Sequence, residues 1–132
     1  PILAGPIVRG KGVGRHLGYP TANLSLDARI LLPANGIYFA HVFGESLRGH
    51  GLLYVGERPT FQGKGRRCEV HVLSLPHGAP YGSRLQVLLR RRIRDDRAFP
   101  DADALRAQIA RDVALAHELA AEDPLPDGPI VG

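Results

Sequence analysis

Apolar and polar residues alternate in short blocks along much of the chain, which predicts a body made of β-strands. Residues 36–43 form a run of β-branched and aromatic side chains that is typical of a strand. Two more strands are expected over residues 47–55 and 67–75, because apolar residues recur in both stretches and residues that break regular structure separate them. The breaking residues are Pro59 and the 63–65 stretch, where we expect turns.

Residues 84–93 predict a further strand, since apolar and polar side chains alternate along them. A period of two is typical of a strand that has one face in the core. Leu88 interrupts the alternation, and the apolar positions that keep to it are Leu85, Val87 and Leu89.

The C-terminal part of the chain predicts one helix that starts after Asp101. Asp is a favourable N-cap residue, and Asp103 in the first turn interacts well with the positive end of the helix dipole. The helix is expected to end near Glu122, because prolines and a glycine follow. A single apolar stripe runs along it at helical spacing: Leu105, Ile109, Val113, Ala116 and Ala120.

Several short strands separated by turns and followed by one helix indicate a mainly β fold, a closed barrel with the helix packed outside. Residues 1–122 are expected to form this single domain, and residues 123–132 a flexible tail rich in Pro and Gly. A chain of 132 residues with 44% hydrophobic and 23% charged residues is long enough for one core and too short for two ordinary domains.

The sequence has the features of a cytoplasmic protein. No apolar run approaches the length of a membrane span, and no basic and then apolar leader opens the chain. The single cysteine, Cys68, excludes an internal disulfide and fits a reducing compartment. We therefore expect a cytoplasmic location and no membrane partner. The chain begins at Pro1 rather than at methionine, as a fragment would.

The formal charge of +4 and the isoelectric point near 9.7 raise the question of a nucleic-acid partner. Aromatic residues make up only 6% of the chain and none interleaves with the main basic cluster, so a base-stacking surface is not supported. A solvated strand face explains the cluster, and a site for an anionic nucleotide also needs positive potential. We therefore expect no nucleic-acid partner. The cluster consists of Arg90, Arg91, Arg92, Arg94 and Arg97.

Residues 10–24 contain four glycines and two basic side chains, and they are the most informative part of the sequence. Glycines allow backbone N–H groups to approach a ligand, and consecutive N–H groups beside a guanidinium form a concave site that suits phosphate. Gly12, Gly14 and Arg15 are the candidates for that site. The spacing matches neither the Walker motif nor the dinucleotide-binding motif, and on local chemistry a glycine-rich hairpin loop is the alternative.

The end of this segment carries two neutral oxygen side chains that face the same way. Pro20 fixes its own φ and moves Tyr19 out of the helical region, so the chain should run extended here. Residues two apart in an extended chain share a face, so Thr21 and Asn23 would present their oxygens together. Mg²⁺ accepts such a set and takes its other ligands from water and phosphate. An ordinary strand is the alternative interpretation.

Glu69 is the candidate acid or base in the strand expected over residues 67–75. It shares a face with His71, whereas Cys68 and Val70 face the other way. A carboxylate there is either a charge at a solvent-facing rim or a group beside a substrate, and the residues alone favour the rim. Cys68 and His71 form a C-x-x-H pair, but their opposite faces and the lack of a second pair argue against zinc.

Six motifs follow one another in the order in which one enzyme family carries them. Together they cover about residues 5–120 and resemble the riboflavin kinases (flavokinases), including the kinase domain of bacterial bifunctional riboflavin kinase/FAD synthetases. The motifs are G-R-x-L-G-Y-P-T-A-N-L from Gly14, L-P-A-N-G-I-Y from Leu32, V-G-E-R-P-T-F from Val55, E-V-H-V-L from Glu69, Y-G from Tyr81 and Q-I-A-R-D from Gln108.

This resemblance implies a six-stranded antiparallel Greek-key barrel with one C-terminal helix packed outside. It also implies transfer of the γ-phosphate of ATP to the terminal ribityl hydroxyl of riboflavin, giving FMN and ADP, with Mg²⁺ as cofactor. Glu69 falls on the carboxylate that serves the family as general base. The expected partners are riboflavin or FMN and ATP or ADP, and an adenylyltransferase domain is expected to be missing from the N-terminal side of this chain.

The resemblance also assigns binding residues. The predicted nucleotide-binding residues are Gly12, Gly14, Arg15, Thr21 and Asn23, of which Thr21 and Asn23 are the predicted Mg²⁺ ligands. Residues 94–99 resemble the mobile loop on the flavin side of the family's site. The predicted flavin-binding residues are therefore Arg94, Asp96 and Phe99.

Two positions depart from the family pattern. Asp96 stands where the family more often has Glu, and Ser74 stands where it commonly has Asp. Both departures bear on substrate fit rather than on reaction type. The alternative function is a non-catalytic flavin- or nucleotide-binding regulatory module derived from the kinase. Thr21, Asn23 and Glu69 argue against that alternative, because a pure binder needs no base.

Overall fold

Six strands and a long C-terminal helix make up the described part of the chain. The computed structural model describes residues 2–8, 19, 21–25, 32–45, 47–60, 63–75 and 82–126. The elements are β1 (Ile2–Val8), β2 (Ala22–Leu24), β3 (Gly36–Gly44), β4 (Arg48–Thr60), β5 (Gly63–Val72), β6 (Arg84–Arg94) and α2 (Ala102–Glu122).

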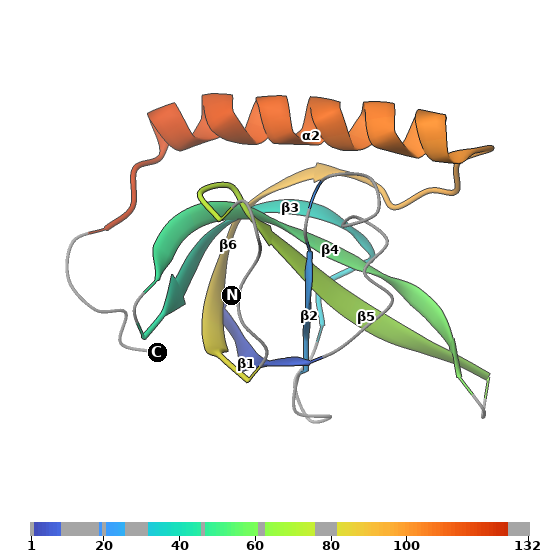
Figure 1. The fold of residues 1–132 in the computed structure, drawn as a ribbon, viewed down its shortest axis with the longest axis horizontal. Coiled ribbons are helices and arrows are strands. Elements are labelled where there is room, and N and C mark those ends of the chain that lie inside the picture. Colours follow the sequence, from blue (N-terminus) through green and yellow to red (C-terminus); the bar gives the residue numbers. More distant parts are fainter. Residues whose placement is uncertain are drawn as a thin grey trace.

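The strands close into a barrel in the order β1-β2-β5-β4-β3-β6, and every neighbouring pair is antiparallel. Strands β3, β4 and β5 follow one another as hairpins, and β6 returns to pair with the free side of β3, which is the Greek-key order. Figure 1 shows the barrel with α2 lying across its outside. The predicted six-stranded barrel with a C-terminal helix is confirmed.

Strand alternation divides the apolar side chains between two cores. The first core fills the barrel, where Cys68, Val70 and Val72 of β5 pack with Leu85 and Val87 of β6. Leu85 and Val87 are positions that the alternation in residues 84–93 placed on the apolar face. Glu69, between Cys68 and Val70, consequently lies on the outer face of the barrel.

The second core lies between the barrel and α2. Ile37 and Phe39 of β3 and Leu52 of β4 pack against Ala116 and Leu119 of the helix. The helix begins and ends where predicted, and its N-cap Asp101 accepts a hydrogen bond from the Ala104 N–H at 2.8 Å. Of the predicted apolar stripe, Ile109 and Ala116 are buried, and Leu105, Val113 and Ala120 are half-buried. No helix among the described residues is long and apolar enough to cross a membrane.

The turns predicted at Pro59 and at residues 63–65 are wrong, because both stretches belong to the β4–β5 ladder. Pro59 is paired with Lys64 and Arg58 with Gly65. Pairing between β3 and β4 stops at the Gly36–Val55 pair, so this part of β4 is an edge strand, where a proline is tolerated. The β4–β5 hairpin therefore extends beyond the barrel (Figure 1). At its other end β5 stops at Val72, three residues before the predicted limit.

The C-terminal end of α2 is fixed to the barrel by a polar cluster around Asp123. His41 and His50, which are partners across β3 and β4, donate from Nε2 to the Asp123 carbonyl oxygen at 3.1 and 2.8 Å. Arg90 of β6 donates from Nε to the Asp123 carboxylate at 2.7 Å. Both histidines must carry their proton on Nε2, because a carbonyl oxygen only accepts. His41 is 2% exposed.

Burial lowers the pKa of His41, although the Asp123 carbonyl and carboxylate act in the opposite direction. The unfolded chain therefore binds this proton at a higher pH than the folded chain does. Stability from neutral His41 is present above its unfolded pKa of about 6.5 and is lost as the pH falls. Arg90 lowers the pKa of Asp123, so that carboxylate titrates below this range.

We therefore expect the free energy of unfolding to fall between pH 7 and pH 5, and His41→Gln to flatten that dependence. Gln keeps a donor near the Nε2 position and does not titrate. Urea unfolding at several pH values is the measurement. His117→Gln is the control, because His117 is exposed on α2. Equal pH slopes in the wild type and His41→Gln would contradict the assignment.

Candidate active site

Glu69 lies at the centre of a row of side chains on the outer face of the barrel. In the strand register it is the direct partner of Asn23 on β2 and of Tyr54 on β4. Ala22 and Leu24 belong to the core inside the barrel, so Thr21 and Asn23 face outward with Glu69. The structure thus brings together the three predicted residues Thr21, Asn23 and Glu69.

The Glu69 carboxylate is buried and held by two contacts. Thr21 donates from Oγ1 to Glu69 Oε1 at 3.0 Å, and Arg67 Nε lies 3.4 Å from Glu69 Oε2. Neither contact was predictable from the local sequence. Thr21 and Glu69 are 48 positions apart, and only the pairing of β2 with β5 joins them. Glu69 is 7% exposed, so it is not the solvent-facing rim charge that the residues alone favoured before the resemblance was considered.

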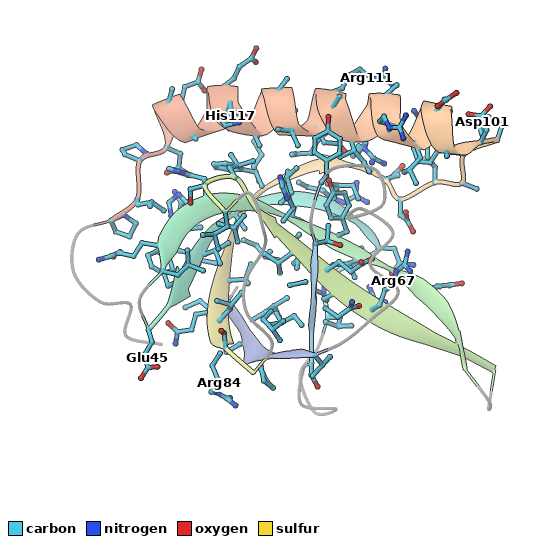
Figure 2. The ribbon with its side chains drawn as sticks, viewed as in Figure 1. Glu45, Arg67, Arg84, Asp101, Arg111 and His117 are labelled. Carbon is cyan, nitrogen blue, oxygen red and sulfur yellow. The ribbon has the colours of Figure 1, made fainter. Side chains whose placement is uncertain are left out.

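A pocket of about 370 Å³ opens beside this row of residues. Its walls are the outer face of the barrel, the segment that connects β6 to α2, and the first turns of α2 (Figure 2). The pocket contains Thr21 and Glu69 on one side and the three predicted flavin-binding residues on the other. It is lined by Thr21, Ile37, Tyr54, Val55, Gly56, Arg67, Glu69, Arg94, Asp96, Arg97, Phe99, Asp101, Ala102, Leu105 and Ile109.

A buried ion pair fixes the connecting segment to α2. Arg94 donates from Nε and Nη2 to the two oxygens of Asp112, at 2.9 and 2.8 Å, and Asp112 is 1% exposed. Gln108 donates from Nε2 to Asp112 Oδ1 at 2.9 Å and accepts from Arg97 Nη2 at 2.8 Å. Arg94 therefore lines the pocket while its guanidinium is bound to the helix. The Q-x-x-x-D spacing, one helical turn, was the signal in the sequence for the Gln108–Asp112 bond only.

Asp96 and Phe99 complete the wall formed by the connecting segment. The Asp96 carboxylate lies over Gly56 of β4, where an added Cβ would come within 2.8 Å of Asp96 Oδ2. The Phe99 ring is 5.1 Å from the Arg97 guanidinium carbon and 5.8 Å from that of Arg94. Cation–π contact at these distances stabilises the position of the ring in the pocket.

Tyr54 is a pocket residue that the sequence analysis missed. It lies directly opposite Glu69 on β4. Burial, with a further contribution from the Asp112 carboxylate, raises the pKa of Tyr54. Its hydroxyl is buried and has no hydrogen-bond partner among the described residues. The apolar pattern of residues 47–55 was the available signal, since it places Leu52 and Tyr54 on one face.

The remaining candidates fall outside this site. Gly12, Gly14 and Arg15 lie outside the described residues. Cys68 is in the barrel core, where burial raises its pKa to about 11, and His71 is on the outer face with its ring 6.1 Å from that of Tyr19. Within the described ranges no group of three or more His, Cys, Asp or Glu side chains could hold a metal ion, so a zinc site there is not supported.

The whole barrel and most of α2 match a family model described as riboflavin kinase, over residues 2–120. The chain is 39% identical over 117 residues to the bifunctional riboflavin kinase/FMN adenylyltransferase of Escherichia coli K12, covering 88% of this chain and 37% of that protein. The chain therefore belongs to the riboflavin kinase (flavokinase) family, and it spans little more than a third of the length of this relative.

Two other similar proteins carry different descriptions. The RNA-binding riboflavin kinase RibR of Bacillus subtilis is 32% identical over 114 residues, covering 86% of this chain and 48% of that protein. A crystal structure titled as a macrolide-efflux protein from Streptococcus pneumoniae has a TM-score of 0.79 and 34% identity, covering 88% of this chain and 38% of that one. The RNA binding and efflux in these names are properties of those proteins.

Removing the charge of Asp112 should loosen the pocket wall. Asp112→Asn leaves the partly buried Arg94 guanidinium without its counter-charge, and breaking such a pair costs about 3 kcal/mol or more of stability. Urea unfolding measures this loss. Asp103→Asn is the control: Asp103 is 91% exposed, and its contact with Arg106 spans 3.5 Å, so its stability should change little. Similar stabilities for the two variants would contradict a structural role for the Arg94–Asp112 pair.

Proposed function

We propose that this chain is a riboflavin kinase, which transfers the γ-phosphate of ATP to the terminal ribityl hydroxyl of riboflavin. The observation that carries the proposal is the pocket itself. A buried carboxylate hydrogen-bonded to a threonine, Glu69 with Thr21, faces the same cavity as Arg94, Asp96 and Phe99. Membership of the riboflavin kinase family supports the choice of substrate.

Glu69 is the proposed general base. Its carboxylate accepts the proton of the ribityl O–H while that oxygen forms a bond to the γ-phosphorus, and the bond from this phosphorus to the bridging oxygen of ADP breaks. The proton ends on Glu69, the phosphoryl group on the ribityl oxygen, and ADP leaves. Thr21 and Arg67 hold the carboxylate in one orientation before substrate binds. Positioning of this kind supplies much of the catalysis in phosphoryl transfer.

Thr21 and Asn23 are the residues that would hold Mg²⁺. Thr21 uses its proton in the bond to Glu69, which leaves the lone pairs of its hydroxyl oxygen for a cation. Asn23 is on the same outer face, two residues along β2, and neutral oxygens of this type fit a hard divalent ion. When bound, the ion neutralises the charge of the ATP phosphates. Gly12, Gly14 and Arg15 are proposed to contact those phosphates.

The proposed product is FMN. The chain aligns with 37% of the E. coli relative, and the adenylyl transfer in that relative's name is not part of this proposal. The alternative is a regulatory module that binds flavin without catalysis. It does not explain the Thr21–Glu69 pair, because binding alone requires no base. The predictions of a cytoplasmic location and of no nucleic-acid partner rest on the sequence alone. The prediction of no nucleic-acid partner gains no support from the relatives, because RibR is named as RNA-binding.

Glu69→Gln separates the enzyme from the binding module. Gln keeps the volume and polarity of Glu69 but cannot accept the hydroxyl proton. We expect FMN formation to fall about 10²- to 10⁴-fold, with riboflavin and ATP affinities nearly unchanged. Chromatographic detection of FMN gives the rate and fluorescence titration gives the affinities. A wild-type chain that binds flavin tightly and makes no FMN would favour the regulatory module, and an active Glu69→Gln would remove the base assignment.

Thr21→Val tests the metal ligand. Val keeps the shape of Thr but removes its oxygen, so we expect turnover to be lost while riboflavin binding is largely retained. Thr21→Ser is the matched control, because it keeps the hydroxyl and should keep most of the activity and its Mg²⁺ dependence. The measurement is the rate of FMN formation across a Mg²⁺ titration. Unchanged Mg²⁺ dependence in an active Thr21→Val would refute this ligand.

A further inference from the structure

We propose that Arg67 binds the phosphate of FMN, and with it the phosphoryl group as it arrives on the ribityl oxygen. This inference rests on the proposed riboflavin kinase function and adds a phosphate-binding side chain to its pocket. Arg67 is two residues before Glu69 on β5 and lines the same cavity. Its side chain is 37% exposed, so a ligand can reach it.

The other two arginines of the pocket are already bound to α2. Arg94 makes two hydrogen bonds to Asp112, and Arg97 donates to Gln108. Arg67, by contrast, has one long contact, from Nε to Glu69 Oε2 at 3.4 Å. Among the described residues its two terminal nitrogens have no hydrogen-bond partner. Arg97 also keeps donors, because only its Nη2 is bound in the described part of the chain, but its bond fixes it to α2. Among the described arginines of the pocket, Arg67 is the one that combines unused donors with a contact to the Glu69 carboxylate.

The position of Arg67 also matches where the phosphate must be. A general base works within about 2.6–3.2 Å of the hydroxyl proton it removes, and the attacking oxygen lies about 3–3.5 Å from the phosphorus. The transferred group is then within about 7 Å of the Glu69 carboxylate. A guanidinium that touches this carboxylate with Nε can place its terminal nitrogens on the phosphoryl oxygens.

Charge gives a second reason for a cation at this point. The phosphate of FMN would lie beside the negative Glu69, and like charges in a partly buried pocket repel. A guanidinium between them offsets this repulsion, and its planar fork matches two phosphate oxygens. Riboflavin has no phosphate and gains nothing from the same side chain. The two flavins therefore differ in the one group that Arg67 is proposed to bind.

Binding of the two flavins is the direct test. Fluorescence titration of the full chain with FMN and, separately, with riboflavin gives both dissociation constants. For Arg67→Ala we expect FMN to bind about 10- to 100-fold more weakly, as for one charge-assisted contact, and riboflavin to bind within about twofold of wild type. Arg67→Lys keeps the charge and loses the fork, so it should recover part of the FMN affinity.

Arg84→Ala is the matched control, because it removes the same charge from an exposed position on the barrel. Figure 2 shows Arg67 on the side of the barrel where Asp101 starts α2, and Arg84 at the opposite end of the barrel. Arg84→Ala should leave both affinities unchanged. Thermal melts of each variant establish that it is folded. If Arg67→Ala does not fold, the comparison of FMN and riboflavin affinities is made with Arg67→Lys.

Three results would overturn the proposal in different ways. An equal loss of affinity for both flavins in Arg67→Ala would mean that Arg67 shapes the pocket rather than binding phosphate. Unchanged FMN affinity would mean that it makes no contact with the phosphate. A wild-type chain that binds neither flavin would overturn the proposed function and this assignment with it.

Discussion

The ion pair between Arg94 and Asp112 is the interaction on which the pocket depends. It joins the last residue of β6 to the middle of α2, so the short connection between them is fixed at both ends. Asp112 is inaccessible to solvent, and a carboxylate in that position is stable only because Arg94 and Gln108 satisfy it. The apolar contacts of α2 set its distance from the barrel. The ion pair fixes the start of the connecting segment, and so determines where Asp96 and Phe99 lie relative to the barrel.

Much of the architecture could be predicted, because local patterns carry it. The period of two in residues 84–93 placed Leu85 and Val87 inside the barrel, and the cap at Asp101 and the breakers after Glu122 bounded the helix. The same period in residues 67–75 separated Glu69 from Cys68 and Val70, and the structure shows that the face of Glu69 is the outer one. The number of strands and their Greek-key order, however, came from the family resemblance, because β1 and β2 are short or irregular in sequence and have no strong pattern of their own.

The contacts that define the candidate site could not be predicted, because they join distant parts of the chain. The bond from Thr21 to Glu69 requires β2 to pair with β5, and no local pattern specifies which strands become neighbours. Asp112 lies on a helix with an amphipathic pattern, in which a carboxylate is normally expected to face solvent. Its burial is explained only by the position of Arg94, which the helix sequence does not specify. Pro59 predicts a turn from the sequence alone, because a proline fits a strand only at a sheet edge. The edge here arises because pairing with β3 stops at Val55.

The contact between Gly56 and Asp96 links two positions whose evolution should be coupled. A methyl group at residue 56 would come within 2.8 Å of Asp96 Oδ2, so the Asp96 carboxylate would have to turn away from β4. Asp96 is exposed and the contact is made by the end of its side chain, so this movement needs no change in the backbone. Among relatives, the loss of glycine at 56 should therefore coincide with a shorter or differently oriented side chain at 96. Residues 56 and 96 are distant in the sequence, but substitutions at the two positions should be correlated.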